Sequence, residues 1–127
     1  MERVELLDIY LAKHHKKVFK WGSNDCCTFS CDWVEEVTGR DIKQFTGEYS
    51  TEEEAKALLE EFGGRDKAEK LFGREVHPAM AQYGDIVCGD VGYGDAFGIC
   101  IGMQSVFLGI KTLVYKNTLH MKRAWRV

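Results

Sequence analysis

Apolar positions at the start of the chain follow the period of an α-helix. They are Val4, Leu6, Leu7, Tyr10 and Leu11. This spacing predicts an amphipathic helix over residues 3–15. After a break near Gly22, Asn24 or Asp25 can cap a second helix that runs to about Val37, and Gly39 stands where a left-handed C-terminal cap is common. The core side of this second helix is expected to hold Cys27, Phe29, Cys31, Trp33 and Val34.

Two further helices are expected before the middle of the chain. Ser50-Thr-Glu-Glu53 has the pattern of a capping box and predicts a helix from Thr51 to Phe62. A shorter helix is expected from Asp66 to Phe72. Both segments alternate charged and apolar positions at helical spacing, which is typical of helices with one solvated face.

The pattern changes after His77, where glycines become frequent and charged residues scarce. Short apolar runs separated by glycine-containing turns predict antiparallel strands, which we expect at residues 86–88, 97–101, 105–108, 112–115 and 124–127. Helices followed by a meander of strands indicate an α+β fold. We therefore expect a single domain over residues 1–127, with a helical half over about 3–75 and a sheet half over about 84–127.

Charge and composition exclude several classes of partner. The chain has 127 residues, 45% of them hydrophobic, and a formal net charge of −3, so a nucleic-acid partner is not expected. No apolar run has the length of about 20 residues that a membrane-spanning helix needs. The N-terminus begins Met1-Glu-Arg-Val-Glu5, unlike a signal peptide. These features predict a cytoplasmic protein or a component of a larger particle.

The five cysteines are expected to be free thiols, because their number is odd and no signal peptide is evident. Their spacing does not form a zinc motif, so no metal or other cofactor is expected. Cys88 and Cys100 lie in apolar runs typical of buried strands.

Cys26 is the main candidate for chemistry. It opens the second helix, where free backbone N–H groups and the helix dipole can lower the pKa of a thiol, and a thiolate is the nucleophile of acyl transfer. Asp25 can cap the helix beside the thiol. Trp21 and Gly22 can supply a wall and a close backbone approach for a substrate. The alternative is that Cys26 is a small residue packed under the sheet.

The order of several motifs resembles the NlpC-type cell-wall cysteine peptidases. They are Phe19-Lys-Trp-Gly-Ser-Asn-Asp-Cys26, Thr38-Gly39, Tyr83-Gly-Asp-Ile-Val87, Phe97-Gly-Ile-Cys-Ile-Gly102 and Ala124-Trp-Arg-Val127. The resemblance spans about residues 18–127 and implies a papain-like fold with Cys26 as the nucleophile. The whole chain is also similar to a group of short phage and prophage proteins of this fold, which implies a place in a bacterial host or a virion.

The same resemblance puts Ala96 where the family has its catalytic histidine. Alanine cannot transfer a proton. The residues that could replace the base are His120, which belongs to the sheet half, His77, His14 and His15. Asp95 could approach the thiol, although its charge would raise the thiol pKa. Tyr83 and Asp95 are expected to contribute to substrate binding, together with Trp21 and Gly22.

Three functions are compatible with this pattern. The first is a phage- or prophage-derived protein with impaired catalysis, which acts in tail or virion assembly or binds a peptide-like or protein partner. The second is an active cysteine hydrolase that cleaves a peptidoglycan peptide or another amide with Cys26 and a relocated base. The third is a thiol-dependent transferase on the same scaffold.

Overall fold

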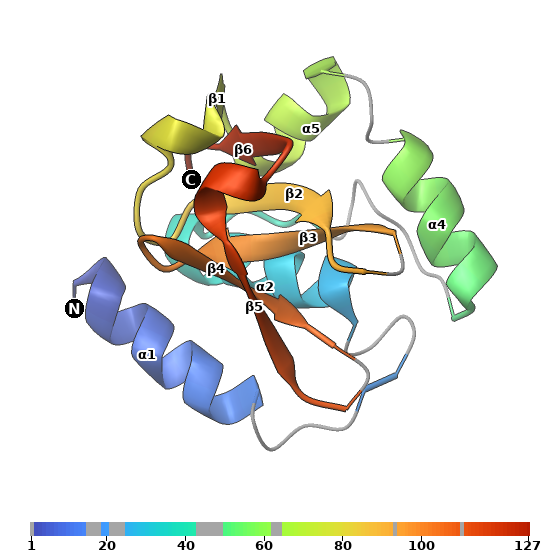
Figure 1. The fold of residues 1–127 in the computed structure, drawn as a ribbon, viewed down its shortest axis with the longest axis horizontal. Helices are drawn as coiled ribbons and strands as arrows, with labels where there is room; N and C mark the ends of the chain where they lie inside the picture. Colours follow the sequence, from blue (N-terminus) through green and yellow to red (C-terminus); the bar gives the residue numbers. More distant parts are fainter. Residues whose placement is uncertain are drawn as a thin grey trace.

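The computed structural model describes residues 2–14, 19–20, 25–42, 50–61, 65–92, 94–109 and 111–127. Four α-helices, two short helices of a single turn and a sheet form the regular structure of the described residues (Figure 1). The helices are α1 (Arg3–His14), α2 (Cys26–Thr38), α4 (Glu52–Glu61) and α5 (Arg65–Phe72). The strands are β1 (Glu75–Val76), β2 (Ile86–Asp90), β3 (Asp95–Cys100), β4 (Gln104–Leu108), β5 (Leu113–Asn117) and β6 (Arg123–Trp125). The predicted α+β class is confirmed.

Helix α2 forms where the apolar spacing predicts it. All the residues expected on its core side are buried, and they are Cys27, Phe29, Cys31, Trp33 and Val34. Gly39 ends the helix with φ of 73°, and its N–H donates to the carbonyl of Glu35. In α1, by contrast, Leu7 and Tyr10 are buried while Val4 is 46% exposed, so the buried stripe begins one turn later than the first apolar position. None of the described helices is long and apolar enough to span a membrane.

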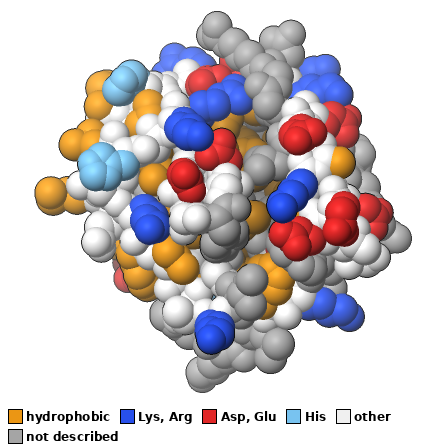
Figure 2. Space-filling view, turned by 45° about the vertical axis from the view of Figure 1, so that its right-hand side comes forward, with side chains coloured by type: hydrophobic (Ala, Val, Ile, Leu, Met, Phe, Trp, Pro, Cys, Tyr) orange, Lys and Arg blue, Asp and Glu red, His pale blue; other side chains and the backbone are white. Residues whose placement is uncertain are grey.

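The cap of α4 lies one residue later than the sequence pattern indicates. Thr51, rather than Ser50, accepts a hydrogen bond from the N–H of Glu54 and donates its hydroxyl to the Glu54 carboxylate. The acidic residues of the first turn are therefore Glu52, Glu53 and Glu54, at the end of the helix where the dipole favours negative charge. Acidic side chains gather toward the right of Figure 2, on the side of the molecule where α4 lies in Figure 1.

All strand pairs of the six-stranded sheet are antiparallel, in the order β1-β6-β2-β3-β4-β5. Strands β2 to β5 form the predicted meander. The last strand does not continue the meander. Strand β6 crosses back to pair with β2, and β1 pairs with the other side of β6 at the edge of the sheet. The sequence prediction missed β1, whose two residues are too few to show an alternating pattern.

The two faces of the sheet are both covered. Ile86, Cys88, Phe97 and Ile99 point toward the helices and join the main core with residues of α1, α2 and α5. The alternate residues Val87, Ala96 and Cys100 join a second cluster with Phe107, Met121 and Ala124. Cys88 and Cys100 are buried as predicted, and all five cysteines are free thiols.

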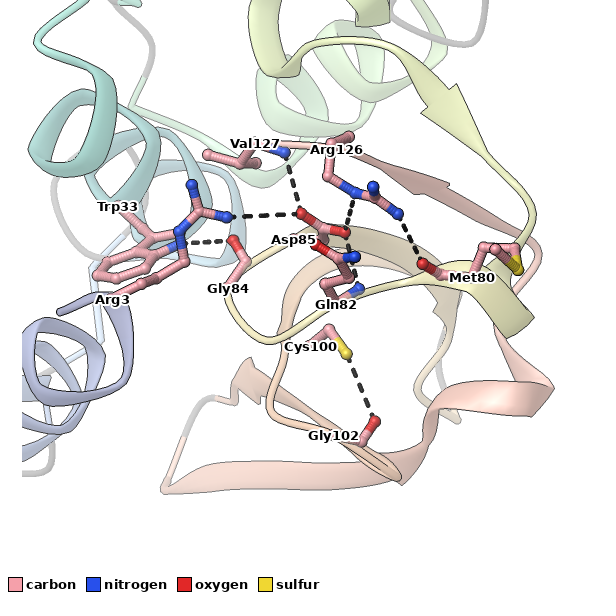
Figure 3. Close-up of polar contacts among 10 residues, drawn as sticks. All are labelled: Arg3, Trp33, Met80, Gln82, Gly84, Asp85, Cys100, Gly102, Arg126 and Val127. Carbon is pink, nitrogen blue, oxygen red and sulfur yellow. Dashed lines mark hydrogen bonds and ion pairs between the residues drawn. The ribbon is translucent and has the colours of Figure 1, made fainter.

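A buried carboxylate ties the sheet to the C-terminus and to α1 (Figure 3). The Asp85 side chain, with no exposed surface, accepts hydrogen bonds from the N–H groups of Gln82 (2.8 Å) and Val127 (3.0 Å). The Arg126 guanidinium donates to it at 2.9 Å, and Arg3 lies 3.9 Å away. Because these partners come from distant parts of the chain, Asp85 fixes how they meet.

Replacing this carboxylate is expected to destabilise the fold. In Asp85→Asn the amide has the same shape but removes the charge that faces Arg126 and presents donors where two backbone N–H groups also donate. We expect the free energy of unfolding to fall by about 2–4 kcal/mol, measured by urea denaturation. The control Asp41→Asn, at an exposed position, is expected to change it by less than about 0.5 kcal/mol. Equal effects of the two substitutions would contradict this role for Asp85.

Candidate functional site

The start of α2 is fixed by a reciprocal cap. The Asp25 carboxylate accepts a hydrogen bond from the N–H of Thr28 (2.9 Å), and the Thr28 hydroxyl oxygen accepts one from the N–H of Asp25 (2.8 Å). Asp25 is fully buried. Cys26 is the first residue of the helix and is partly buried. The predicted cap at Asp25 is present, and Thr28 completes it in the way that Glu or Gln completes an ordinary capping box.

Helix α2 packs chiefly on β3, and this contact brings Cys26 to the beginning of that strand. The backbone N–H of Phe97 hydrogen-bonds to the Cys26 sulfur, and Cys26 packs against the cluster that contains Ala96. The structure therefore brings together the cysteine and the strand position that the resemblance pairs with it. Ala96 is itself buried, with 3% of its surface exposed.

The thiol of Cys26 is not activated in this environment. Burial, together with smaller contributions from the nearby Cys27, Asp25 and Cys88, raises its pKa from 9.0 to about 12. The hydrogen bond from the Phe97 N–H acts in the opposite direction but is outweighed. The expectation of a lowered pKa at the helix N-terminus is therefore wrong, because desolvation of the thiolate is the larger effect. At neutral pH Cys26 carries its proton.

A second cysteine of α2, Cys31, also has a raised pKa. The sulfur atoms of Cys27 and Cys31 lie 3.9 Å apart, one helical turn from each other, and form a hydrogen bond. This contact and burial raise the pKa of Cys31 well above its ordinary value. Burial also raises the pKa of Cys88 on β2 to about 11. Burial thus favours the neutral thiol form of both Cys31 and Cys88.

The candidate histidines are engaged elsewhere or exposed. His14 is buried in α1, and its Nδ1 lies 3.0 Å from the carbonyl oxygen of Tyr10. His77 precedes the short helix η1 (Pro78–Met80), and its Nδ1 accepts a hydrogen bond from the N–H of Ala79. His120 is exposed at the end of the short helix η2 (Thr118–His120). His15 lies outside the described residues.

Met121, which follows His120, lies over the strand next to Ala96. Its Sδ is 2.7 Å from the point where a side chain on Gly89 would begin, and Gly89 pairs with Ala96 across β2 and β3. Met121 and Ala96 belong to the same buried cluster. The segment around His120 therefore brings an apolar side chain, and not an imidazole, to the strands beside Cys26.

Of the predicted substrate-binding residues, Tyr83 lies away from Cys26. Tyr83 donates its hydroxyl to Asp8 of α1 (3.2 Å), and the adjacent Gly84 accepts a hydrogen bond from the Trp33 indole. Trp33 is seven residues along α2 from Cys26, which corresponds to about 10 Å along the helix axis. Tyr83 therefore lies toward the other end of α2. Trp21 and Gly22 lie outside the described residues.

Asp95, another predicted binding residue, directly precedes Ala96. It begins β3, and its carboxylate pairs with the Lys122 ammonium at 2.8 Å. Trp33 and Trp125 have no exposed surface and belong to the core. The sequence did not reveal that Cys26 contacts the Phe97 backbone N–H, nor that Met121 belongs to the cluster against which Cys26 packs. A backbone group leaves no signal in a sequence, and a methionine between two turns shows no distinctive pattern.

No group of three or more His, Cys, Asp or Glu side chains in the described ranges is arranged to hold a metal ion.

The effect of Asp25 on the thiol can be separated from its role as a cap. In Asp25→Asn the side-chain oxygen can still cap α2, but the negative charge that raises the pKa of Cys26 is gone. We expect the thiol pKa to fall yet to remain above 9.0, because burial, the largest cause, persists. The measurement is the rate of iodoacetamide labelling of Cys26 against pH, followed by mass spectrometry.

The control is Asp32→Asn, because Asp32 raises the pKa of Cys31 and of Tyr10 on α1 but is not among the groups that act on Cys26. It should leave the labelling profile of Cys26 unchanged. An unchanged profile in Asp25→Asn would show that the carboxylate does not act on the thiol.

Comparison with known proteins gives one family. No curated protein matches the chain. Residues 3–127, which is nearly the entire sequence, match the family described as a domain of unknown function, DUF6950. The chain therefore belongs to the DUF6950 family.

Proposed function

We propose that this protein is a non-hydrolytic domain of the NlpC-like, papain-like plan that binds a peptide-like or protein partner. The observation that carries the proposal is the pairing of a protonated Cys26 with Ala96 at the start of β3. Cys26 is at the position that the resemblance gives to the nucleophile. Ala96, at the position that the resemblance gives to the catalytic histidine, has only a methyl side chain.

The chemistry of thiol hydrolases explains why this pairing argues against catalysis. Attack on an amide needs a thiolate and then a group that protonates the leaving amine. With its pKa raised to about 12, Cys26 is a thiol and not a thiolate at pH 7. The groups that act on the thiol are other thiols, the Asp25 carboxylate and the Phe97 N–H, and none of these acts as a general acid at neutral pH.

The setting of this function follows from the resemblance alone. Short phage and prophage proteins of similar sequence imply a role in tail or virion assembly, in the cytoplasm of a bacterial host or in the particle itself. A domain with this arrangement of helices and strands but without a proton-transfer group can still bind a partner through its surface. We therefore favour binding of a phage structural protein or a peptide-like partner.

An active cysteine hydrolase is the alternative. It is favoured by the position of Cys26 at the first turn of α2 and by the Phe97 N–H, which could also donate to an oxyanion. In that case the exposed His120 would have to move to the thiol. A thiol-dependent transferase would need the same activation of Cys26.

A direct assay separates these functions. The protein and its Cys26→Ser variant are incubated with peptidoglycan and with soluble cell-wall peptides, and the products are followed by mass spectrometry. We expect no cleavage by either protein. Cleavage by the wild-type protein that is absent in Cys26→Ser would overturn the proposal and establish the hydrolase.

A second test restores the missing group. In Ala96→His an imidazole beside the thiol is expected to increase the labelling rate of Cys26 at pH 7 by about tenfold or more, because it can accept the thiol proton. The matched variant Ala96→Gln introduces a polar side chain of similar length without a base and should not. A result in which both variants label alike would count against the proposed equivalence of Ala96 and the catalytic histidine.

A further inference from the structure

The segment between β5 and β6 is fastened to β2, the strand next to β3. We call residues 117–122 the strap, and it includes η2, which is drawn in red in Figure 1. The N–H of Lys122 in the strap donates to the carbonyl of Cys88 on β2 at 2.9 Å. Cys88 pairs across the sheet with Phe97, whose N–H hydrogen-bonds to the Cys26 sulfur. The strap therefore reaches the strands that position the thiol.

Buried hydrogen bonds hold the other end of the strap. The Thr118 hydroxyl donates to the carbonyl of Gly102 at 2.9 Å, and its oxygen lies 2.8 Å from the hydroxyl oxygen of Ser105. Thr118 and Ser105 are both buried. The N–H of Met121 donates back to the carbonyl of Thr118 at 3.1 Å. Because Thr118 and Lys122 are both held, the position of Met121 between them is fixed as well.

Met121 fills a space that a glycine leaves open. A Cβ atom on Gly89 would lie 2.7 Å from the Sδ atom of Met121 and 2.9 Å from its Cε atom, which is too close for a side chain to fit unless the methionine moves. Gly89 does not have a positive φ, so the packing depends on its missing side chain and not on its backbone freedom. The long, unbranched side chain of methionine suits an irregular space of this kind.

The space that Met121 fills lies beside Ala96. Gly89 and Ala96 are direct partners across β2 and β3, so their Cβ positions are on the same face of the sheet, about 4.5–5.5 Å apart. Met121 and Ala96 are both buried, and they belong to the cluster against which Cys26 packs. A larger side chain at position 96 would therefore have to share this space with Met121.

The two neighbouring residues His120 and Met121 point in opposite directions from the strap. Met121 has only 6% of its surface exposed, whereas His120 is exposed. The imidazole could approach the sheet only if the strap turned and withdrew Met121 from the cluster. The hydrogen bonds of Thr118 and Lys122 oppose such a turn. The packing of Met121 thus keeps His120 away from the strands beside Cys26.

We infer that Met121 closes the candidate site on the side of Ala96. Its side chain occupies the space from which a base or a substrate atom would approach Cys26, and the strap holds it there. This inference rests on the proposed non-hydrolytic function, and it names the side chain by which the fold keeps the site closed.

Truncation of Met121 tests this inference. In Met121→Ala water gains access to the space beside Ala96, and we expect the rate of iodoacetamide labelling of Cys26 at pH 7 to rise by about tenfold or more. Met121→Leu keeps an apolar side chain of similar volume and should change the rate by less than about threefold. The control Met80→Ala, which shortens a methionine that is 64% exposed, should not change it.

Cys31 is the internal reference for this measurement. It lies on the same helix as Cys26 but belongs to the main core and not to the cluster of Met121. The labelled cysteine is located by fragmentation of the peptides in the mass spectrometer. We expect Met121→Ala to increase the rate at Cys26 and to leave the rate at Cys31 unchanged. An equal rise at both thiols would overturn the inference, because the substitution would then have loosened the whole fold.

A substitution on the other side of the contact gives an independent test. Gly89→Ala adds a methyl group where the Met121 Sδ atom lies, so it should displace that side chain and increase the labelling rate of Cys26 by about threefold or more. In Gly89→Ala/Met121→Ala the methyl group meets no methionine side chain and should add nothing to the effect of Met121→Ala. An unchanged rate in Gly89→Ala, or full additivity of the two effects, would contradict the inferred contact.

The response to an introduced base is a readout that general packing does not change. In Ala96→His/Met121→Ala the imidazole has room beside the thiol. The increase in the labelling rate of Cys26 at pH 7 should therefore exceed the product of the increases in the two single variants. An increase no larger than that product would show that Met121 does not occupy the space of the base, and the inference would fail.

The failure of this inference can be told apart from the failure of the proposed function. Unchanged labelling of Cys26 in Met121→Ala would overturn the role of Met121 and leave the non-hydrolytic function standing, because other groups would then protect the thiol. Cleavage of a cell-wall peptide that depends on Cys26 would instead contradict the proposed function, whatever the Met121 variants show.

Discussion

The buried carboxylate of Asp85 is the interaction on which the rest of this structure depends. It sits in the turn immediately before β2 and accepts from the backbone of Gln82 and of the C-terminal Val127, while Arg126 neutralises its charge. The carbonyl of the same residue accepts from the N–H of Cys100 at the end of β3. A carboxylate without water around it is stable only when it is paired and hydrogen-bonded in this way. Its partners are therefore held in one arrangement.

This arrangement extends to the candidate site through α2. The Trp33 indole donates to the carbonyl of Gly84, the residue before Asp85, and so fixes α2 relative to the turn. With α2 fixed at that point, its first residue, Cys26, lies against the beginning of β3. Two influences then compete at the thiol. A helix N-terminus contributes about 0.3–1 kcal/mol, which corresponds to less than one pKa unit, whereas the combined surroundings of Cys26 raise its pKa from 9.0 to about 12.

The sequence was informative wherever a local pattern determines the structure. The apolar spacing of α2, the cap at Asp25 and the left-handed Gly39 all depend on neighbouring residues, and all were predicted. The crossing of β6 back to β2 depends on long-range contacts such as those of Arg126, so the pattern of the chain predicted a simple meander instead. The sequence could not decide between Ser50 and Thr51 as the cap of α4 for a different reason. Both residues carry a hydroxyl followed three positions later by glutamate, and the structure uses Thr51.

The site was predictable in position but not in its chemistry. From the order of the motifs we expected Cys26 and Ala96 to lie close together. The protonation of a thiol, however, depends on how much water reaches it, and only the packed structure reveals this. Tyr83 illustrates the same limit: its neighbours in the sequence belong to a motif, yet its hydroxyl pairs with Asp8 of α1.

The proposed function has one central premise, namely that Cys26 is held as a neutral thiol. The most direct measurement is the ultraviolet absorbance of thiolate against pH, taken as the difference between the wild-type protein and Cys26→Ser. Burial at the start of α2 predicts that no thiolate from Cys26 appears at neutral pH and that its titration lies far above the free-cysteine value of about 8.5. Appearance of the Cys26 thiolate below that value would contradict the account.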